Sequence, residues 1–344
     1  MADLSTQYMG LKLKNPVIIG SSGITSTISE IKQASESGAG AVVLKSIFEE
    51  QISHETDKFM DGGSGSMDTF QKGYQDVLSS RAYDYAQAFD YVADYAREHT
   101  LSSYLNFIEE AKRASDIPVI ASINCVSAYD WHYFARRIEA AGADALELNI
   151  YILPSNTGKN SAENEQIYFD VAEAVLKQVK IPVSIKVGYY FSSLADTLIK
   201  LSQTGIKGLV MFNRPFHPDI DINSMEVTSK YLLSDPTEYS LSLRWMALLS
   251  GRVGCNLVAS TGIHTAEAAI KQLLAGATAI QMASVLYKNG IGQVGTVVKG
   301  INDWMEAKGY DTLDEFRGKL SQGKIENPAD FERVQFMKLY SKIV

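Results

Sequence analysis

Eight short apolar runs, separated by stretches of helical length, most constrain what this chain can fold into. Each run is almost continuously apolar and bounded by turn residues, which is typical of strands buried on both faces of a parallel sheet. The predicted strands are residues 16–20, 41–45, 118–123, 145–150, 182–187, 208–212, 256–260 and 279–283. The predicted helices between them are residues 28–37, 131–141, 162–179, 194–204 and 266–274.

Eight strand–helix units with short helix-to-strand turns favour the α/β class and a single (β/α)8 TIM barrel. An open doubly wound sheet is the alternative, but no G-x-G-x-x-G pattern follows any of the strands. The chain has 344 residues, which a simple length rule would divide into two domains, yet such barrels often exceed about 250 residues as one unit. We therefore predict one domain over residues 1–344.

Two strand-to-helix connections are much longer than a minimal barrel needs. They are residues 46–101, after the second strand, and residues 213–239, after the sixth. Both belong to the carboxyl-terminal face, where barrel enzymes build their sites. The first contains a tyrosine-rich helical stretch, residues 81–97, which we interpret as packing or dimer-contact surface.

Composition excludes several classes of partner. The formal net charge is −8, whereas nucleic acids and anionic membranes select a basic face. No apolar run approaches the roughly 20 residues of a membrane span, and the amino terminus lacks the apolar segment of a signal peptide. Cys125 and Cys255 lie in apolar contexts typical of reduced thiols. We expect a cytoplasmic protein with a small-molecule substrate.

The carboxyl-terminal ends of the strands carry small, hydroxyl and amide side chains together with two lysines, Lys45 and Lys186. A lysine at the end of a buried strand needs a partner, which is either a structural group or an anionic or electron-rich ligand. After the last two strands, Ser260–Thr261–Gly262 and Ala283–Ser284 form turns suited to presenting backbone N–H groups to a phosphate. Together these features predict a phosphorylated cofactor.

Six segments carry a resemblance to a known family. They are LKLKNPVIIGSSGITST, SGAGAVVLKS, PVIASINCVSAYDWHYFARRIEAAGADALELNI, PVSIKV, NLVASTGIHTAEAAIKQLLAGATAIQMASVLYKNG and KGYDTLDEFRGKL. They resemble the soluble class of dihydroorotate dehydrogenases nearly from end to end. The resemblance implies a cytosolic homodimer that binds flavin mononucleotide (FMN). It also implies oxidation of dihydroorotate to orotate for pyrimidine biosynthesis, by hydride transfer to flavin N5.

The resemblance and the phosphate-type turns together give a set of expected FMN contacts. In the family, a lysine matching Lys186 stabilises the anionic reduced flavin. Ala283–Ser284 departs from the family's Gly-Thr but keeps a small residue and a hydroxyl. The expected contacts are Ser21, Ser22, Gly23, Lys45, Ser46, Ser122, Asn149, Lys186, Asn213, Ser260, Thr261, Gly262, Ala283 and Ser284.

The substrate side departs from the family pattern. The family has Asn-x-Ser-Cys-Pro-Asn, whose cysteine takes a proton from the substrate, but this chain reads NIYILPSN from Asn149. The position of the base then holds Leu153 or Ile152, neither of which accepts a proton. The family also has a proline-containing substrate loop after the second strand, and this chain has IFEEQISHETDKFM in its place. As catalytic candidates we name Lys45, Ser155 and Tyr151, whereas Cys125 and His217 are interpreted as a buried thiol and a loop histidine.

Expected substrate contacts are Lys45, Asn149, Asn213 and Arg214, where Arg214 suits a carboxylate. A structural salt bridge from Arg214 within the connection 213–239, which contains Asp219, Asp221 and Glu226, is equally compatible with the sequence. Three alternative functions stay open: a flavoprotein for another small carboxylate, a catalytically inactive homologue, and a flavin-free lyase or isomerase. We find no metal-binding, iron–sulfur or nicotinamide motif, although a separate subunit could supply either of the last two.

Overall fold

The computed structural model describes residues 2–48, 101–125, 131–214, 218–229 and 233–332. Within them, eight parallel strands form a closed barrel because β4 pairs with β6 and β13 pairs with β3. Each overlaps one of the eight predicted runs, so the predicted (β/α)8 fold is confirmed. The strands are β3 (Val17–Ile19), β4 (Ala41–Val43), β6 (Val119–Cys125), β7 (Ala145–Ile150), β8 (Val183–Val187), β9 (Gly208–Met211), β12 (Asn256–Ala259) and β13 (Ala279–Met282).

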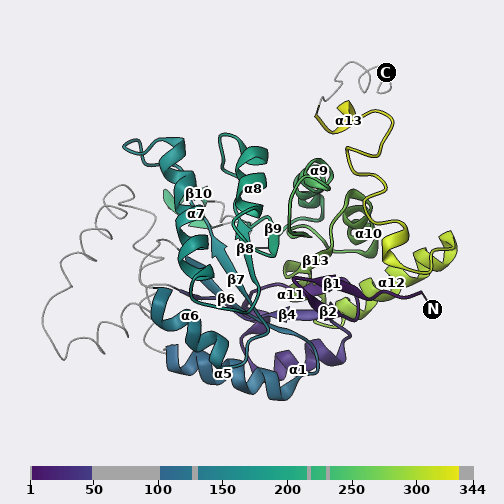
Figure 1. Ribbon diagram of the computed structural model, residues 1–344, viewed down its shortest axis with the longest axis horizontal. Helices are drawn as coiled ribbons and strands as arrows, with labels where there is room; N and C mark the ends of the chain where they lie inside the picture. The colour runs from purple at the N-terminus through teal and green to yellow at the C-terminus, as the bar shows by residue number, and fades with distance from the viewer. Residues whose placement is uncertain (1, 49–100, 126–130, 215–217, 230–232, 333–344) are drawn as a thin grey trace, which may run out of the picture.

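Helices surround the strands (Figure 1). The five predicted helices are confirmed as α1 (Ile28–Glu36), α6 (Trp131–Ala140), α7 (Ser161–Leu176), α8 (Leu194–Ser202) and α10 (Ala266–Ala275). Local sequence explains their ends: α10 begins after Thr265, whose hydroxyl accepts from Ala268 N, and ends at Gly276 with φ +121°. Helices that the sequence analysis did not name are α5 (Leu101–Ala114), α9 (Tyr239–Leu249), α11 (Ser284–Asn289), α12 (Gln293–Lys308) and α13 (Ala329–Glu332).

A short hairpin closes the amino-terminal end of the barrel. It consists of β1 (Thr6–Tyr8) paired with β2 (Leu11–Leu13). Tyr8 is fully buried and packs with Ile18, Val43 and other inward-facing residues of the strands. A Cβ at Gly208 would lie 2.9 Å from the Tyr8 hydroxyl, so this strand position has room for glycine only. The hairpin thus completes the core at the amino-terminal end of the barrel. The opposite, carboxyl-terminal end remains open for a functional site.

A bulge interrupts the second barrel strand next to that opposite end. Val43 pairs with Ile120 and Ile47 pairs with Ile123, so three residues of this strand face two residues of β6. The strand resumes as β5 (Ile47–Phe48). Bulges redirect side chains and occur beside active sites. The predicted run 41–45 was therefore too long by two residues, and Lys45 lies in the bulge.

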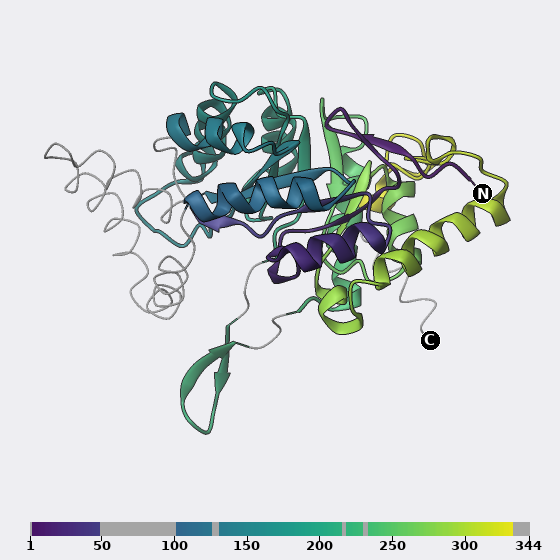
Figure 2. The ribbon, with the colours of Figure 1, turned by 90° about the horizontal axis from the view of Figure 1, so that it is seen from below.

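The long connection after β9 contains an antiparallel hairpin, β10 (Pro218–Asp221) and β11 (Glu226–Ser229). It projects away from the body of the molecule (Figure 2). Most of the connection after the second strand, including the tyrosine-rich stretch 81–97, lies outside the described residues, as do His217 and the side chain of Cys125. In the described parts of the chain, no helix is both long and apolar enough to cross a membrane.

Candidate active site

A pocket at the carboxyl-terminal end of the barrel brings together residues from both ends of the chain. Its wall includes Ser21 after β3, Lys186 on β8 and Asn213 after β9. The two phosphate-type turns complete it. Of the expected FMN contacts, those lining the pocket are Ser21, Lys186, Asn213, Ser260, Thr261, Gly262, Ala283 and Ser284. Closure of the barrel is what places the first strand beside the last, so these residues become neighbours.

Lys186 is the buried cation of this pocket, with 8% of its surface exposed. Its Nζ donates to Gln281 Oε1 at 3.1 Å. Burial lowers the pKa of Lys186, and the nearby Glu147 carboxyl opposes that shift. A buried ammonium beside a cavity is suited to stabilising negative charge on a ligand.

Three hydroxyl groups form a row along the neighbouring strands. Ser21 Oγ lies 3.0 Å from Ser46 Oγ, which lies 2.8 Å from Ser122 Oγ. Tyr104 of α5 anchors the row, because its hydroxyl donates to Ser122 O and accepts from Ser122 N. The three serines were predicted from the sequence, whereas Tyr104 was not, because α5 was not among the predicted helices. Ser22 follows Ser21 and caps a short 3-10 helix, residues Gly23–Thr25, which begins at Gly23.

Asn149 supplies an unsatisfied acceptor. It pairs in register with Lys186 on the adjacent strand, so the two side chains lie on the same face of the sheet. Its Oδ1 is buried and has no hydrogen-bond partner among the described residues. Leaving such an atom unpaired costs about 1–3 kcal/mol. A buried cation next to an unpaired acceptor fits the polar edge of a flavin, which both accepts and donates hydrogen bonds.

The first phosphate-type turn is held in an unusual backbone conformation. Thr261 and Gly262 both have φ +73°, and Thr261 Oγ1 donates to Phe212 O at 3.0 Å. A β-branched residue at positive φ is strained, and such strain is concentrated at functional sites. A Cβ on Gly262 would come within 2.2 Å of Tyr239 N, so glycine is required there. The turn at Thr261–Gly262 thus presents main chain rather than a bulky side chain to the pocket.

Three polar residues at this end, Ser234, His264 and Lys288, were not predicted from the sequence. Ser234 N donates to Ser284 Oγ at 3.0 Å, and Ser234 Oγ lies 3.0 Å from His264 Nε2. Lys288 Nζ donates to Ser234 O at 3.1 Å. His264 could have been predicted from the sequence, because it lies two residues after Gly262 of the first phosphate-type turn. Together, a cation and two hydrogen-bonding side chains surround the place expected to hold phosphate.

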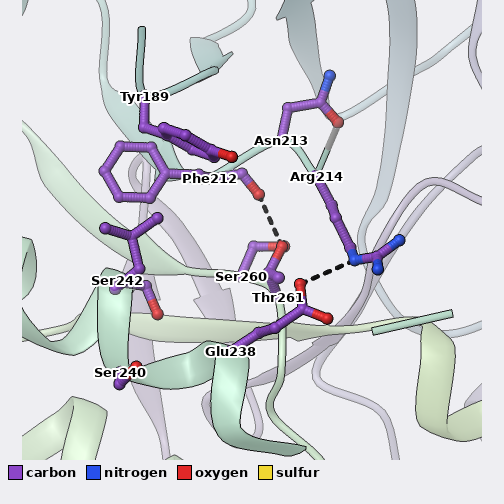
Figure 3. Close-up of a pocket in the computed structure, with 10 residues that line it drawn as sticks. Tyr189, Phe212, Asn213, Arg214, Glu238, Ser240, Ser242, Ser260 and Thr261 are labelled. Atoms are coloured by element: carbon purple, nitrogen blue, oxygen red, sulfur yellow. Dashed lines mark hydrogen bonds and ion pairs between the residues drawn. The ribbon is translucent and has the colours of Figure 1, made fainter. Parts of the chain in front are cut away.

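Arg214 forms an ion pair within the connection 213–239, which is the structural alternative given above. Its Nε lies 2.8 Å from Glu238 Oε2, next to the start of α9 (Figure 3). Asp221 and Glu226 are instead exposed on the hairpin. Arg214 also lines a second pocket together with Tyr189, Phe212 and Ser260. A salt bridge is therefore present, and the arginine still borders the space beside the first pocket.

A family model described as dihydroorotate dehydrogenase matches residues 3–305. The chain belongs to this family. A catalytic subunit of dihydroorotate dehydrogenase B (NAD(+)) from Thermoplasma volcanium is 25% identical over 325 residues, covering 92% of this chain and 98% of the relative. The corresponding subunit from Pyrococcus abyssi is 25% identical over 321 residues, covering 92% and 98%. Dihydroorotate dehydrogenase A (fumarate) from Lactococcus lactis is 23% identical over 337 residues, covering 92% and 99%.

Within this family, the candidates for the proton acceptor lie in three different environments. Tyr151 is half-buried and packs edge-on against Tyr190, and burial raises its pKa, so its phenolate is disfavoured. Ser155 is exposed in the turn after β7, where its N–H donates to Leu153 O. Lys45 lies half-buried in the strand bulge, and burial lowers its pKa. Of these three, Lys45 is the one whose pKa is shifted toward its neutral, proton-accepting form.

Proposed function

We propose that this chain is an FMN-dependent oxidoreductase that oxidises dihydroorotate to orotate. One observation carries the proposal: in a chain that matches the family model over residues 3–305, buried Lys186 and the two phosphate-type turns line the same pocket. When bound, FMN supplies the acceptor for the hydride that leaves the substrate. The remaining chemistry belongs to the side chains around it.

Each part of the pocket has a role in this proposal. Lys186 stabilises negative charge on the ring, and Asn149 Oδ1 accepts a hydrogen bond from it. The row of Ser21, Ser46 and Ser122 orients polar groups along the opposite side. The turns at Gly262 and Ser284 receive the phosphate, with Lys288 adding positive charge.

Lys45 is the proposed acceptor of the proton that leaves C5 of the substrate. In the neutral form its Nζ has a lone pair, and the lowered pKa increases the neutral fraction at a given pH. The proton passes to Nζ and the electron pair of the C5–H bond forms the new double bond, as the hydride leaves C6. Arg214 and Asn213, which border both pockets, are the proposed contacts of the substrate carboxylate.

The test is anaerobic titration of the FMN-reconstituted protein with dihydroorotate, followed by its visible spectrum. Bleaching of the flavin bands is the expected result. A flavin that dithionite reduces but dihydroorotate does not would replace this proposal with another small carboxylate as substrate, or with an inactive homologue. A protein that binds no flavin would instead favour a lyase or isomerase acting on a phosphorylated metabolite.

Variants of the three candidate bases make the proton transfer testable. Lys45→Met is expected to slow flavin reduction by dihydroorotate by about 10²–10⁴-fold, the usual loss when a general base is removed. Tyr151→Phe and Ser155→Ala are expected to change the rate by less than about threefold. The Tyr151 phenol is hard to ionise, and the Ser155 hydroxyl is exposed to solvent. The measurement is stopped-flow reduction at saturating substrate.

Retention of FMN by each variant, measured by fluorescence quenching, is the control in that series. A large rate loss in Ser155→Ala or Tyr151→Phe, with Lys45→Met nearly normal, would move the base to the loop after β7.

A further inference from the structure

A row of three buried polar side chains crosses the barrel at the pocket. Gln281 on β13 stands in the middle, between Lys186 on β8 and Glu147 on β7. Lys186 Nζ donates to Gln281 Oε1 at 3.1 Å, and Gln281 Nε2 donates to Glu147 Oε2 at 2.6 Å. Glu147 and Gln281 are 0% and 2% exposed. The row therefore connects a fully buried carboxyl group to the cation of the pocket.

Lys186 and Glu147, at the two ends of this row, determine the orientation of the Gln281 amide between them. An ammonium group can only donate, so the amide oxygen of Gln281 has to face Lys186 and its NH₂ has to face Glu147. The chain also provides space for this orientation. A Cβ at Gly20 would lie 3.2 Å from Gln281 Oε1, tighter than most such contacts. Glycine at this position therefore lets the amide reach Lys186.

The row is not expected to contribute much to the stability of the fold. Glu147 Oε1 is buried and has no hydrogen-bond partner among the described residues. Burying charged groups costs several kcal/mol each, and apolar residues of similar volume often stabilise a fold at least as well. A half-satisfied network in the barrel is thus better explained by what it does to Lys186.

Electrostatics gives the direction of that effect. Burial lowers the pKa of Lys186 and raises that of Glu147, and each group opposes the shift of the other. Among the described residues, Tyr8 of the amino-terminal hairpin also faces Glu147; burial and Glu147 raise the pKa of Tyr8, so it stays neutral. The Glu147 carboxylate therefore favours the protonated form of Lys186, against the effect of burial.

We propose that Glu147 is a positioning residue that, through Gln281, keeps Lys186 protonated and directed toward the pocket. Glu147 itself touches no ligand. Its charge determines how strongly the pocket favours an anion or an electron-rich ring. The part of this inference that concerns flavin rests on the proposed function, whereas the part that concerns the protonation of Lys186 does not.

The first experiment uses the protein without cofactor. The lysine side chains are labelled with carbon-13 at Cε, and the Lys186 signal is identified by its loss in Lys186→Met. Glu147→Gln keeps the shape and a carbonyl acceptor but removes the charge. We expect the titration midpoint of Lys186 to fall by about one pH unit or more in this variant. An unchanged midpoint in a folded Glu147→Gln protein would overturn the proposal.

Ser184→Ala is the matched control. Ser184 pairs in register with Glu147 on the next strand, is fully buried, and has no hydrogen-bond partner among the described residues. Removing its hydroxyl perturbs the same layer of the barrel without altering the charge near Lys186. We expect the Lys186 midpoint to stay at the wild-type value. An equal fall in both variants would mean that disturbed packing in this layer of the barrel, not the lost Glu147 charge, lowers the Lys186 midpoint.

The second experiment uses the FMN-loaded protein and measures the reduction potential of the bound flavin. Loss of positive charge at Lys186 disfavours the reduced anionic ring, so Glu147→Gln is expected to give a more negative potential than wild type, with Ser184→Ala unchanged. An unchanged potential in Glu147→Gln would contradict the flavin part. If wild type bound no FMN, the proposed function would fail, and the titration of Lys186 would still decide the inference.

Discussion

His264 shows how much chemistry one side chain adds at the phosphate end of the site. Its Nε2 lies 3.0 Å from Ser234 Oγ, and its backbone carbonyl accepts from Gln293 Nε2. Burial lowers its pKa below 6.5, Lys288 adds to this shift, and Asp235 and Glu238 oppose it. The imidazole is therefore neutral at pH 7 and takes part in hydrogen bonding rather than charge pairing.

A pH dependence of stability follows from the lowered pKa of His264. As the pH falls below 6.5, the unfolded chain binds the proton before the folded chain does. The stabilisation is therefore fully present above that pH and is lost as the pH falls through the lower folded pKa. We expect His264→Gln to weaken this acid-side loss, measured as the unfolding midpoint in urea at pH values on both sides of 6.5. Equal pH slopes in variant and wild type would contradict the prediction.

At the scale of elements, the β1–β2 hairpin closes the amino-terminal end of the barrel. Tyr8 fills the space above Gly208, and its hydroxyl is buried without a hydrogen-bond partner among the described residues. The ring therefore contributes packing, whereas the hydroxyl contributes little.

Two substitutions separate these contributions of Tyr8. Tyr8→Phe is expected to keep the unfolding free energy within about 1 kcal/mol of wild type or to raise it, because it deletes an unpaired buried hydroxyl. Tyr8→Ala is expected to cost about 3–5 kcal/mol through the cavity that it leaves. Urea unfolding followed by circular dichroism measures both. A loss in Tyr8→Phe comparable to that in Tyr8→Ala would show that the hydroxyl is bonded after all.

At the scale of the whole molecule, the β10–β11 hairpin is the feature that the barrel does not explain. Ile220 and Val227 are directly opposite each other and are 66% and 60% exposed, and Ile222 and Met225 at its tip are 84% and 86% exposed. An isolated two-stranded hairpin is marginally stable in water, and a projecting apolar surface is typical of an interaction site. This surface is suited to the homodimer that the family resemblance predicts.

The homodimer can be tested by sedimentation velocity. We expect wild type to sediment as a dimer and Ile222→Asp to shift it toward monomer, because a buried carboxylate in the interface is costly. Leu320→Asp is the control, since Leu320 is also exposed, at 49%, but lies far from the hairpin in sequence. A monomeric wild type would refute the homodimer, and a dimeric Ile222→Asp protein would place the interface elsewhere.

The eight strands and five of the helices could be predicted from sequence because hydrophobic runs, caps and glycines act locally. The same is true of the rim residues, since a polar side chain directly after a buried strand has to lie at the carboxyl end of the barrel. The sequence alone also predicts that the family's catalytic cysteine is missing, because the stretch after Asn149 reads NIYILPSN. These features need only neighbouring residues to be recognised.

Tertiary structure decided which of these residues act together. The bulge that displaces Lys45 depends on the register between β4, β5 and β6, and the ion pair of Arg214 joins it to Glu238 at the start of α9. The row through Gln281 joins residues 95 and 134 positions apart in the chain. Barrel closure brings them into contact, and burial then changes their pKa values. Neither effect is encoded in a local pattern, because both depend on what the rest of the fold places around each side chain.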